Sequence, residues 1–414
     1  MTERDAIGIF GKMNSGKSSL MNLITQQETS IVDASPGTTA DTKITLMEIH
    51  GLGPVKLLDT AGFDEGDKLG DKKRIKVLSA MKECDLILLV IDPSTNDFEQ
   101  EGILVRQVRE QDKQMIIVYN LFGENDSGFI NQVEKALPEL QYYPKISLSV
   151  IYQSFRQEIL SIILDKYISR NFAVELLPFL KKYEFYILNI PMDEETPPGR
   201  YLRPQAMAEE YITRNWAYPV SYRIDLSKAR GGDISERRRW DVFINSFTSR
   251  PKAVITDSQA IDIMKDYVPA DMGLTTFSIM MINFMSRGRL GAFVKGVKEM
   301  KRLQPGDKIL IAEACNHSRI KEDIGTVQIP RFLKKHYPGL IVDHSFGREF
   351  DEKNNLNEYK LVIHCGGCMI SSQKLSARLR DLEASGVPVT NYGILLSYFQ
   401  GEEVLNRVIK PWMS

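Results

Sequence analysis

Cysteine is scarce in this sequence, and its scarcity excludes one class of protein. Four cysteines among 414 residues are too few for the disulfide framework of a small secreted domain. An excess of charge of either sign is also missing, because the formal net charge is −1. Nothing overall therefore favours nucleic acid or an acidic membrane surface. The run Arg237–Arg239 is local and predicts a solvated helix face.

Long apolar segments are missing as well. The longest, around 277–285, is interrupted by Ser278 and Asn283 and is too short to span a bilayer. The first five residues are mostly polar or charged and lack the apolar core of a signal peptide. We therefore expect a cytoplasmic protein, in which a reducing environment disfavours structural disulfides.

The length predicts two to four domains. Residues 5–165 alternate short apolar strands with amphipathic helices, which predicts a mainly parallel sheet covered on both faces. A smaller α/β module follows, with a strand expected over 220–226, and α/β alternation with a parallel sheet returns towards the end of the chain. We expect a nucleotide-binding domain over 1–170, a dimerisation domain over 171–265 and a metal-binding domain over 266–414.

A phosphate-binding loop lies near the start of the chain. Residues 11–18 read G-x-x-x-x-G-K-S, after a predicted strand and before a predicted helix. Backbone amides and the helix N-terminus in such a loop bind phosphate. Lys17 is expected to reach the β- and γ-phosphates and Ser18 to hold Mg2+. The loop residues expected to bind the nucleotide are Gly11, Asn14, Ser15, Gly16, Lys17, Ser18 and Ser19.

A second motif supports the first. Residues 59–62 read D-T-A-G at the end of a predicted strand, the D-x-x-G pattern of GTPases. Asp59 is expected to support Mg2+ through its water shell, and the Gly62 amide to sense the γ-phosphate. Residues 36–41 look like the switch segment between the two motifs, with Thr39 as a further Mg2+ ligand.

The guanine-reading motif is degenerate. GTPases place the motif N-K-x-D directly after a strand, here the predicted strand 115–119, and the Asp of this motif reads the guanine edge. Here Asn120 is kept, but Leu121 replaces the Lys and Gly123 replaces the Asp. Asp126 follows three residues later and could substitute only from a rearranged loop, so guanine specificity is less well supported than phosphate binding.

Over residues 5–165 the chain resembles bacterial GTPases of the Era and TrmE group. Asn14 stands at the position associated with potassium binding in that group. Phe63 stands where Ras-like enzymes have the Gln that orients the attacking water. Because an apolar side chain cannot orient water, the resemblance implies slow hydrolysis that suits a switch.

Three of the four cysteines gather near the end of the chain. Cys315 and His317 form a C-x-H patch, and residues 364–368 read H-C-G-G-C, with Cys365 and Cys368. Both patches follow predicted strands, at the sheet edge where ligands bind in open α/β folds. Three thiolates suit either an iron–sulfur cluster with one open iron or zinc with a fourth ligand. Cys84, by contrast, is expected to be a buried small apolar side chain.

Together with the nucleotide domain, these patches resemble the FeFe-hydrogenase maturation GTPases of the HydF family, over the whole chain. The resemblance implies a 4Fe-4S cluster on Cys315, Cys365 and Cys368, and a dimer or higher oligomer. It also implies a scaffold that carries the diiron subcluster precursor to apo FeFe-hydrogenase, with two radical-SAM maturases as further partners. The implied cofactors are GTP, Mg2+ and K+, and neither nucleic acid nor membrane is an expected partner.

Two other functions stay open from the residues alone. One is a zinc-binding regulatory GTPase of the translation or tRNA-modification type, and the other is an assembly or storage protein with a vestigial nucleotide site. The fourth ligand of a cluster is also open. His317, His364, solvent or a carboxylate from 347–351 could supply it, and an exchangeable ligand is favoured, with His317 and Glu349 as the named possibilities.

Overall fold

The computed structural model describes residues 4–26, 43–60, 77–123, 126–168, 174–191, 201–313, 324–346, 355–367 and 370–413. The chain divides into two compact units, residues 1–173 and residues 174–414. Among the described residues, no helix combines the length and the apolar character that crossing a bilayer requires.

The first unit is a six-stranded sheet in the order β2-β3-β1-β4-β5-β6. Neighbouring strands are parallel except β2 and β3, which form an antiparallel pair. The mainly parallel sheet expected from the sequence is therefore confirmed. Its strands are β1 (Asp5–Phe10), β2 (Lys43–Ile49), β3 (Gly53–Asp59), β4 (Leu86–Ile91), β5 (Gln114–Asn120) and β6 (Lys145–Leu148).

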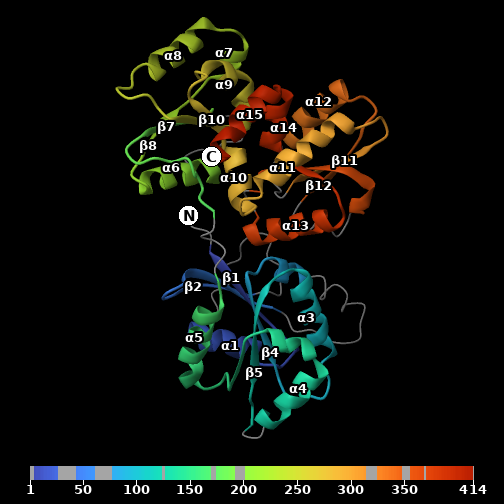
Figure 1. The fold of residues 1–414 in the computed structure, drawn as a ribbon. Helices are drawn as coiled ribbons and strands as arrows, with labels where there is room; N and C mark the ends of the chain where they lie inside the picture. Colours follow the sequence, from blue (N-terminus) through green and yellow to red (C-terminus); the bar gives the residue numbers. More distant parts are fainter. Residues whose placement is uncertain are drawn as a thin grey trace. The chain divides into compact units, whose positions relative to one another are not determined.

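Helices cover both faces of this sheet (Figure 1). One apolar core contains Leu20 and Leu23 of α1 with Ile159 of α5, and the other contains Leu104 of α3 with Val133 of α4. The inner strands β1 and β4 are buried along their whole length, as expected for parallel strands packed on both sides. These helices are α1 (Lys17–Thr25), α3 (Glu99–Glu110), α4 (Ile130–Ala136) and α5 (Arg156–Lys166).

The second unit contains two four-stranded parallel sheets that share one apolar core. The first has the order β10-β9-β7-β8 and the second β12-β11-β13-β14. The strands are β7 (Phe185–Asn189), β8 (Tyr218–Tyr222), β9 (Ala253–Thr256), β10 (Gly273–Thr276), β11 (Lys308–Glu313), β12 (Ile341–Phe346), β13 (Tyr359–His364) and β14 (Val389–Asn391). The strand β10 extends the first sheet beyond residue 265. The division of this unit into two domains at residue 265 remains a prediction.

Helices connect and cover these strands, and the apolar α10 lies in the shared core. The apolar stretch around 277–285 is thus a buried helix of a globular unit. The helices are α6 (Arg203–Arg214), α7 (Leu226–Arg230), α8 (Ile234–Ile244), α9 (Ile261–Tyr267), α10 (Phe277–Met285), α11 (Leu290–Val297), α12 (Ile329–His336), α13 (Ser372–Ala384), α14 (Tyr392–Phe399) and α15 (Glu402–Ile409).

The strand expected over 220–226 was wrong at its end. β8 stops at Tyr222, and α7 begins at Leu226 because the Asp225 side chain accepts a hydrogen bond from the Lys228 amide at 3.0 Å. An Asp in this position satisfies an amide that has no partner within the helix, so it starts a helix rather than continuing a strand.

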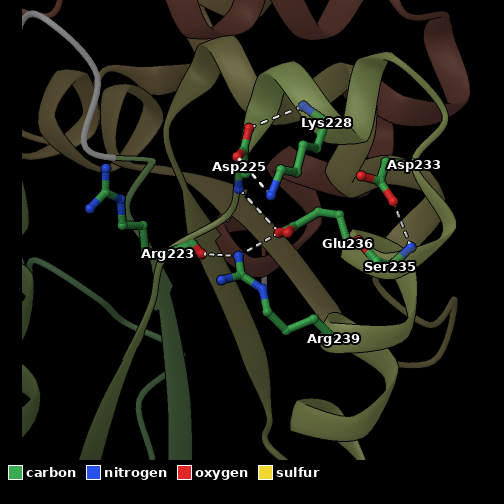
Figure 2. A network of polar contacts seen from close by, with 7 residues as sticks. All are labelled: Arg223, Asp225, Lys228, Asp233, Ser235, Glu236 and Arg239. Carbon is green, nitrogen blue, oxygen red and sulfur yellow. Dashed lines mark hydrogen bonds and ion pairs between the residues drawn. The ribbon is translucent and has the colours of Figure 1, made fainter.

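The contact between Asp225 and Lys228 belongs to a network of polar contacts, shown in Figure 2, that also includes a second helix cap and a buried carboxylate. The Asp233 side chain caps α8 on the Ser235 amide at 2.8 Å. The Glu236 carboxylate accepts from the Asp225 amide at 3.1 Å and from Arg239 at 2.6 Å. A cavity of about 390 Å³ borders the network, between Pro191 and Arg239. Because these charges compensate one another, we assign the network to holding α7 and α8 in place.

The arginines of α8 agree with the predicted solvated helix face. Arg237 and Arg239 have side chains that are 43% and 52% exposed, and they pair along the helix with Asp241 and Glu236. The Arg237–Asp241 pair is exposed on both sides and contributes little to stability, whereas the Arg239–Glu236 pair uses a carboxylate that is 4% exposed.

Candidate functional site

The phosphate-binding loop has a backbone that only particular residues tolerate. It leaves β1 at Gly11, where a Cβ atom would lie 2.3 Å from the Val90 carbonyl oxygen, and enters α1 at Gly16, with φ of +101°. Asn14 has φ of +62°, a conformation that Asn accepts more readily than most side chains. Among the residues predicted to bind the nucleotide, these three therefore also shape the loop.

The start of α1 is open to an anion. Among the described residues no side chain caps this helix end, and its first amides point towards the loop. Lys17 is 7% exposed, and its Nζ atom donates to the Lys12 carbonyl oxygen at 2.6 Å. The ammonium group therefore lies over the loop, where a bound phosphate would meet it.

Ser18 and Asp59 meet at the ends of α1 and β3. The Ser18 hydroxyl donates to Oδ2 of Asp59 at 2.7 Å, while Oδ1 of Asp59 is buried and has no hydrogen-bond partner among the described residues. Burial raises the pKa of the Asp59 carboxyl, and the Ser18 hydrogen bond and the Lys17 charge oppose that rise. A hydroxyl beside an unsatisfied buried carboxylate oxygen fits a hard divalent cation and its waters. These residues therefore suit Mg2+.

The Asn120 side chain joins the phosphate loop to the far end of the site. Its Nδ2 atom donates to the Ser15 carbonyl oxygen at 2.9 Å, and its Oδ1 atom accepts from the Val150 amide at 3.2 Å. Gly16 allows this approach, because a Cβ atom there would lie 2.3 Å from Asn120 Nδ2. The structure thus brings together the described members of the predicted nucleotide site. Thr39, Gly62, Phe63 and the segment 36–41 lie outside the described residues.

At the C-terminal edge of the last sheet, one of the three predicted metal-binding thiols is described. Cys365 directly follows β13, is 6% exposed, and its amide donates to the Ala312 carbonyl oxygen of β11 at 3.0 Å. The chain then turns at Gly367, with φ of +68°. A buried thiol at the end of a parallel strand, followed by a tight turn, suits a metal ligand. Cys315, His317, Glu349 and Cys368 lie outside the described residues.

Within the described part of the chain, no group of three or more His, Cys, Asp or Glu side chains could hold a metal ion. Cys84 is distant in sequence and belongs to the first unit, where it is fully buried and its thiol donates to the Ala80 carbonyl oxygen at 3.2 Å. Burial raises the pKa of this thiol to about 12. The prediction that Cys84 is a buried apolar side chain is confirmed.

His364 lies beside Cys365 but uses both of its ring nitrogens elsewhere. Nδ1 lies 2.7 Å from the Cys365 carbonyl oxygen, which can only accept, so Nδ1 carries the proton. Nε2 lies 3.1 Å from Nη1 of Arg378, which can only donate, so its lone pair is used there. This neutral tautomer has no lone pair left for a metal, which favours a structural role for His364 over ligation.

Sequence reasoning did not identify α13, the helix whose Arg378 contacts His364. Lys374 and Arg378, one turn apart on α13, are 2% and 1% exposed. Charged side chains on a helix are normally exposed, so no sequence signal marked these two as buried. Arg378 reaches the edge that carries Cys365 through its contact with His364.

Comparison with known proteins agrees with the two units. Residues 6–121 match the family model of the 50S ribosome-binding GTPases. Residues 232–286 match the hydrogen maturase F dimerization domain, and residues 291–411 match the hydrogen maturase F tetramerization domain. The chain therefore carries a GTPase domain followed by two domains whose descriptions indicate homo-oligomers.

Individual relatives match the nucleotide domain. The GTPase Der of Chloroflexus aurantiacus is 36% identical over 155 residues, 35% of this chain and 34% of that protein. The tRNA modification GTPase MnmE of Natranaerobius thermophilus is 32% identical over 144 residues, 34% of this chain and 30% of that protein. The chain thus spans about a third of the length of these curated relatives.

Solved structures include Era with MgGDPNP and a 16S ribosomal RNA segment. It is 26% identical to this chain, with a TM-score of 0.34, and the match covers 41% of this chain and 58% of that one.

The P-loop GTPase domain is thus followed, in order, by two domains specific to hydrogen maturase F. The chain belongs to the HydF family of hydrogenase maturation GTPases.

Proposed function

We propose that this chain is a nucleotide-controlled scaffold for assembly of the FeFe-hydrogenase cofactor. In this proposal Cys315, Cys365 and Cys368 hold one 4Fe-4S cluster, and the chain delivers the diiron subcluster precursor to apo FeFe-hydrogenase. The observation that carries the proposal is the buried Cys365 at the strand edge of a HydF-family chain. The two radical-SAM maturases are the proposed suppliers of the precursor, and the cytoplasm is the proposed compartment.

The residues around Cys365 have a supporting role in the proposal. When bound, the cluster would supply an iron that has no thiolate and can accept a ligand from the cargo. Arg378 Nη1 lies 3.1 Å from Nε2 of His364, so that ring nitrogen is engaged by Arg378 and His364 supports the edge without ligating the cluster. The fourth ligand would be exchangeable, with His317 and Glu349 as candidates.

The nucleotide site would act as a slow switch. Lys17 would exchange its bond to the Lys12 carbonyl oxygen for the β- and γ-phosphates, and Ser18 and Thr39 would hold Mg2+ with Asp59 in support. Gly62 would sense the γ-phosphate, and Asn14 would be the ligand for K+. Omission of K+ should lower the turnover of GTP if Asn14 has this role, and an unchanged rate would remove it.

Transfer of the cargo tests the proposal. The chain, isolated without oxygen after coexpression with the two maturases, is mixed with apo FeFe-hydrogenase, and hydrogen evolution is measured. We expect activation by the wild-type protein and none by Cys365→Ala. Equal activation by both proteins would contradict the proposed scaffold role of this edge.

The fourth ligand has its own test. Imidazole or cyanide added to the reduced protein should shift the g-values of its electron paramagnetic resonance (EPR) spectrum, because an exchangeable ligand gives way to a stronger one. An unchanged spectrum would indicate a tightly held protein ligand instead. A colourless protein that contains zinc and no iron would favour the regulatory-GTPase alternative.

A further inference from the structure

Lys12, the second residue of the phosphate loop, is a position that the G-x-x-x-x-G-K-S motif leaves unspecified. Its Nζ atom lies 2.6 Å from the carbonyl oxygen and 2.6 Å from Oδ2 of Asp97, which precedes α3, and 3.8 Å from Oε2 of Glu101 within α3. Oδ1 of Asp97 accepts from the Glu99 amide at 3.1 Å, so Asp97 is itself fixed to the start of this helix. A side chain of the loop is thus held by an element at least 85 residues away in the sequence.

Glu101 has an unusual place for a carboxylate, on the buried side of a helix. Its side chain is 3% exposed, and its Oε2 atom has no hydrogen-bond partner among the described residues. Burial raises the pKa of this carboxyl, and the charge of Lys12 opposes that rise. In the described part of the chain, the Lys12 ammonium is the one cation paired with it. Lys12 therefore compensates a charge that would otherwise be buried without a partner.

The backbone of Lys12 contacts the residue that would bind phosphate. Its carbonyl oxygen accepts from Lys17 Nζ at 2.6 Å and from the Ser15 amide at 3.3 Å. The neighbouring Gly11 is closely packed on β4, since a Cβ atom there would lie 2.3 Å from the Val90 carbonyl oxygen. The anchored side chain of Lys12 therefore also fixes the place of its own carbonyl oxygen, from which Lys17 would leave for the phosphates.

We propose, on the basis of the nucleotide switch described above, that Lys12 is a positioning residue. Its pairs with Asp97 and Glu101 hold the phosphate loop in the shape that receives a triphosphate, and Lys12 itself contacts no phosphate. A loop freed from this anchor must be ordered again each time a nucleotide binds. Since ordering one residue costs roughly tenfold in affinity, the anchor should contribute an effect of this size.

The two acids separate this role from direct attraction of the nucleotide. Removal of negative charge beside a phosphate site strengthens phosphate binding when charge alone matters. In the positioning role the same change weakens binding, because the loop loses its anchor. The double variant Asp97→Asn/Glu101→Gln removes both charges and keeps an oxygen at position 97 for the Glu99 amide. Because the Lys12 side chain is 21% exposed, water can solvate its ammonium group in this variant.

The test is calorimetric titration of the full-length protein with the β,γ-imido analogue of GTP in the presence of Mg2+, together with steady-state hydrolysis of GTP. We expect Asp97→Asn/Glu101→Gln to weaken binding by about tenfold. KM should rise by about as much, and kcat should change by less than about threefold, because the anchor acts equally on bound substrate and transition state.

Two further variants complete the test. Lys12→Arg keeps the charge and can pair with both acids, so it should bind the analogue within about threefold of the wild type. Glu99→Gln is the matched control, because it removes a carboxylate of the same helix that the structure does not pair with Lys12. It should bind as tightly as the wild type or slightly more tightly.

Three results would overturn this inference. The first is an acid double variant that binds the analogue as tightly as the wild type or more tightly. The second is a Lys12→Arg protein that binds as weakly as the acid double variant, and the third is a loss of kcat with KM unchanged. Failure of the proposed switch has a different signature, because then the wild type itself does not bind the analogue, or Lys17→Ala binds it as well as the wild type does.

Discussion

The two ends of this chain place their candidate sites in the same way but build them differently. In both units the functional residues follow the carboxyl ends of parallel strands, which is where open α/β sheets bind ligands. The phosphate site comes from one uninterrupted loop, residues 11–18, whose glycines set its shape. The proposed cysteine site draws on two separate sequence patches, of which the structure describes Cys365, and the neighbouring α13 carries buried charged residues.

The comparison shows that a binding site can be recognised from the sequence more readily when its residues are contiguous. A loop that binds phosphate with its own backbone needs Gly and Lys at fixed spacing, so the spacing alone predicts it. A site whose residues come from several strands has no such spacing, and its supporting charges look like ordinary surface residues. The first difference to test is therefore whether the two sites can be disabled independently.

The largest expected effect is that of Lys17→Ala. Loss of the ammonium group should weaken nucleotide binding by about a hundredfold or more, because at least two charged contacts to phosphate are lost. Iron content should not change, since the cysteine edge belongs to the other unit. Titration with the imido analogue of GTP and iron analysis measure the two effects.

Lys56→Ala is the matched control, because Lys56 lies on β3 and pairs with Glu83. It should bind nucleotide like the wild type. If Lys17→Ala also lost its iron, the independence of the two sites would be wrong.

A smaller effect is expected from Gly296→Ala, on α11 in the second unit. A Cβ atom there would lie 1.9 Å from the Val389 carbonyl oxygen of β14, so helix and strand must move apart at a cost of roughly 2–3 kcal/mol. All three tryptophans lie in the second unit, and Trp240 is fully buried. Denaturation followed by tryptophan fluorescence therefore reports this unit selectively.

Gly291→Ala in the same helix is the control, since no atom of the described residues lies within 4 Å of its added Cβ atom. It should leave stability unchanged or raise it by up to about 1 kcal/mol. Nucleotide affinity should be unaffected by both substitutions. A Gly296→Ala protein as stable as Gly291→Ala would contradict the observed close packing of α11 against β14.

The smallest effect concerns Asp59. Burial raises the pKa of its carboxyl, so the ionised form costs stability in the nucleotide-free protein. This cost is absent below the unfolded pKa and grows as pH rises through the raised pKa of the folded state. Asp59→Asn should therefore lose Mg2+-dependent hydrolysis yet melt slightly higher at neutral pH, by at most about 2–4 °C.

The melting difference between Asp59→Asn and the wild type should shrink as pH falls towards 4, about the ordinary pKa of an Asp carboxyl. Scanning calorimetry across this pH range checks the sign. A difference that grows on acidification would show that Asp59 is stabilised in its charged form.

Particular residues show where sequence reasoning succeeded and where it could not. The parallel sheet and the phosphate loop followed from apolar strands and a fixed motif. The end of β8 was wrong because the Asp225 cap outweighs the β propensity of the residues around it. Arg378 was missed because its partner His364 lies 14 residues away across a strand end, and no local pattern encodes such a contact.

The iron–sulfur content of the protein tests the central claim most directly. The anaerobically purified wild type should contain about four irons and four sulfides per chain and give the EPR signal of a reduced 4Fe-4S cluster. Cys315→Ala, Cys365→Ala and Cys368→Ala should each lose most of the iron or change that signal, while Cys84→Ala should keep both. Full iron and an unchanged signal in all three variants would contradict the claim that these cysteines hold one cluster.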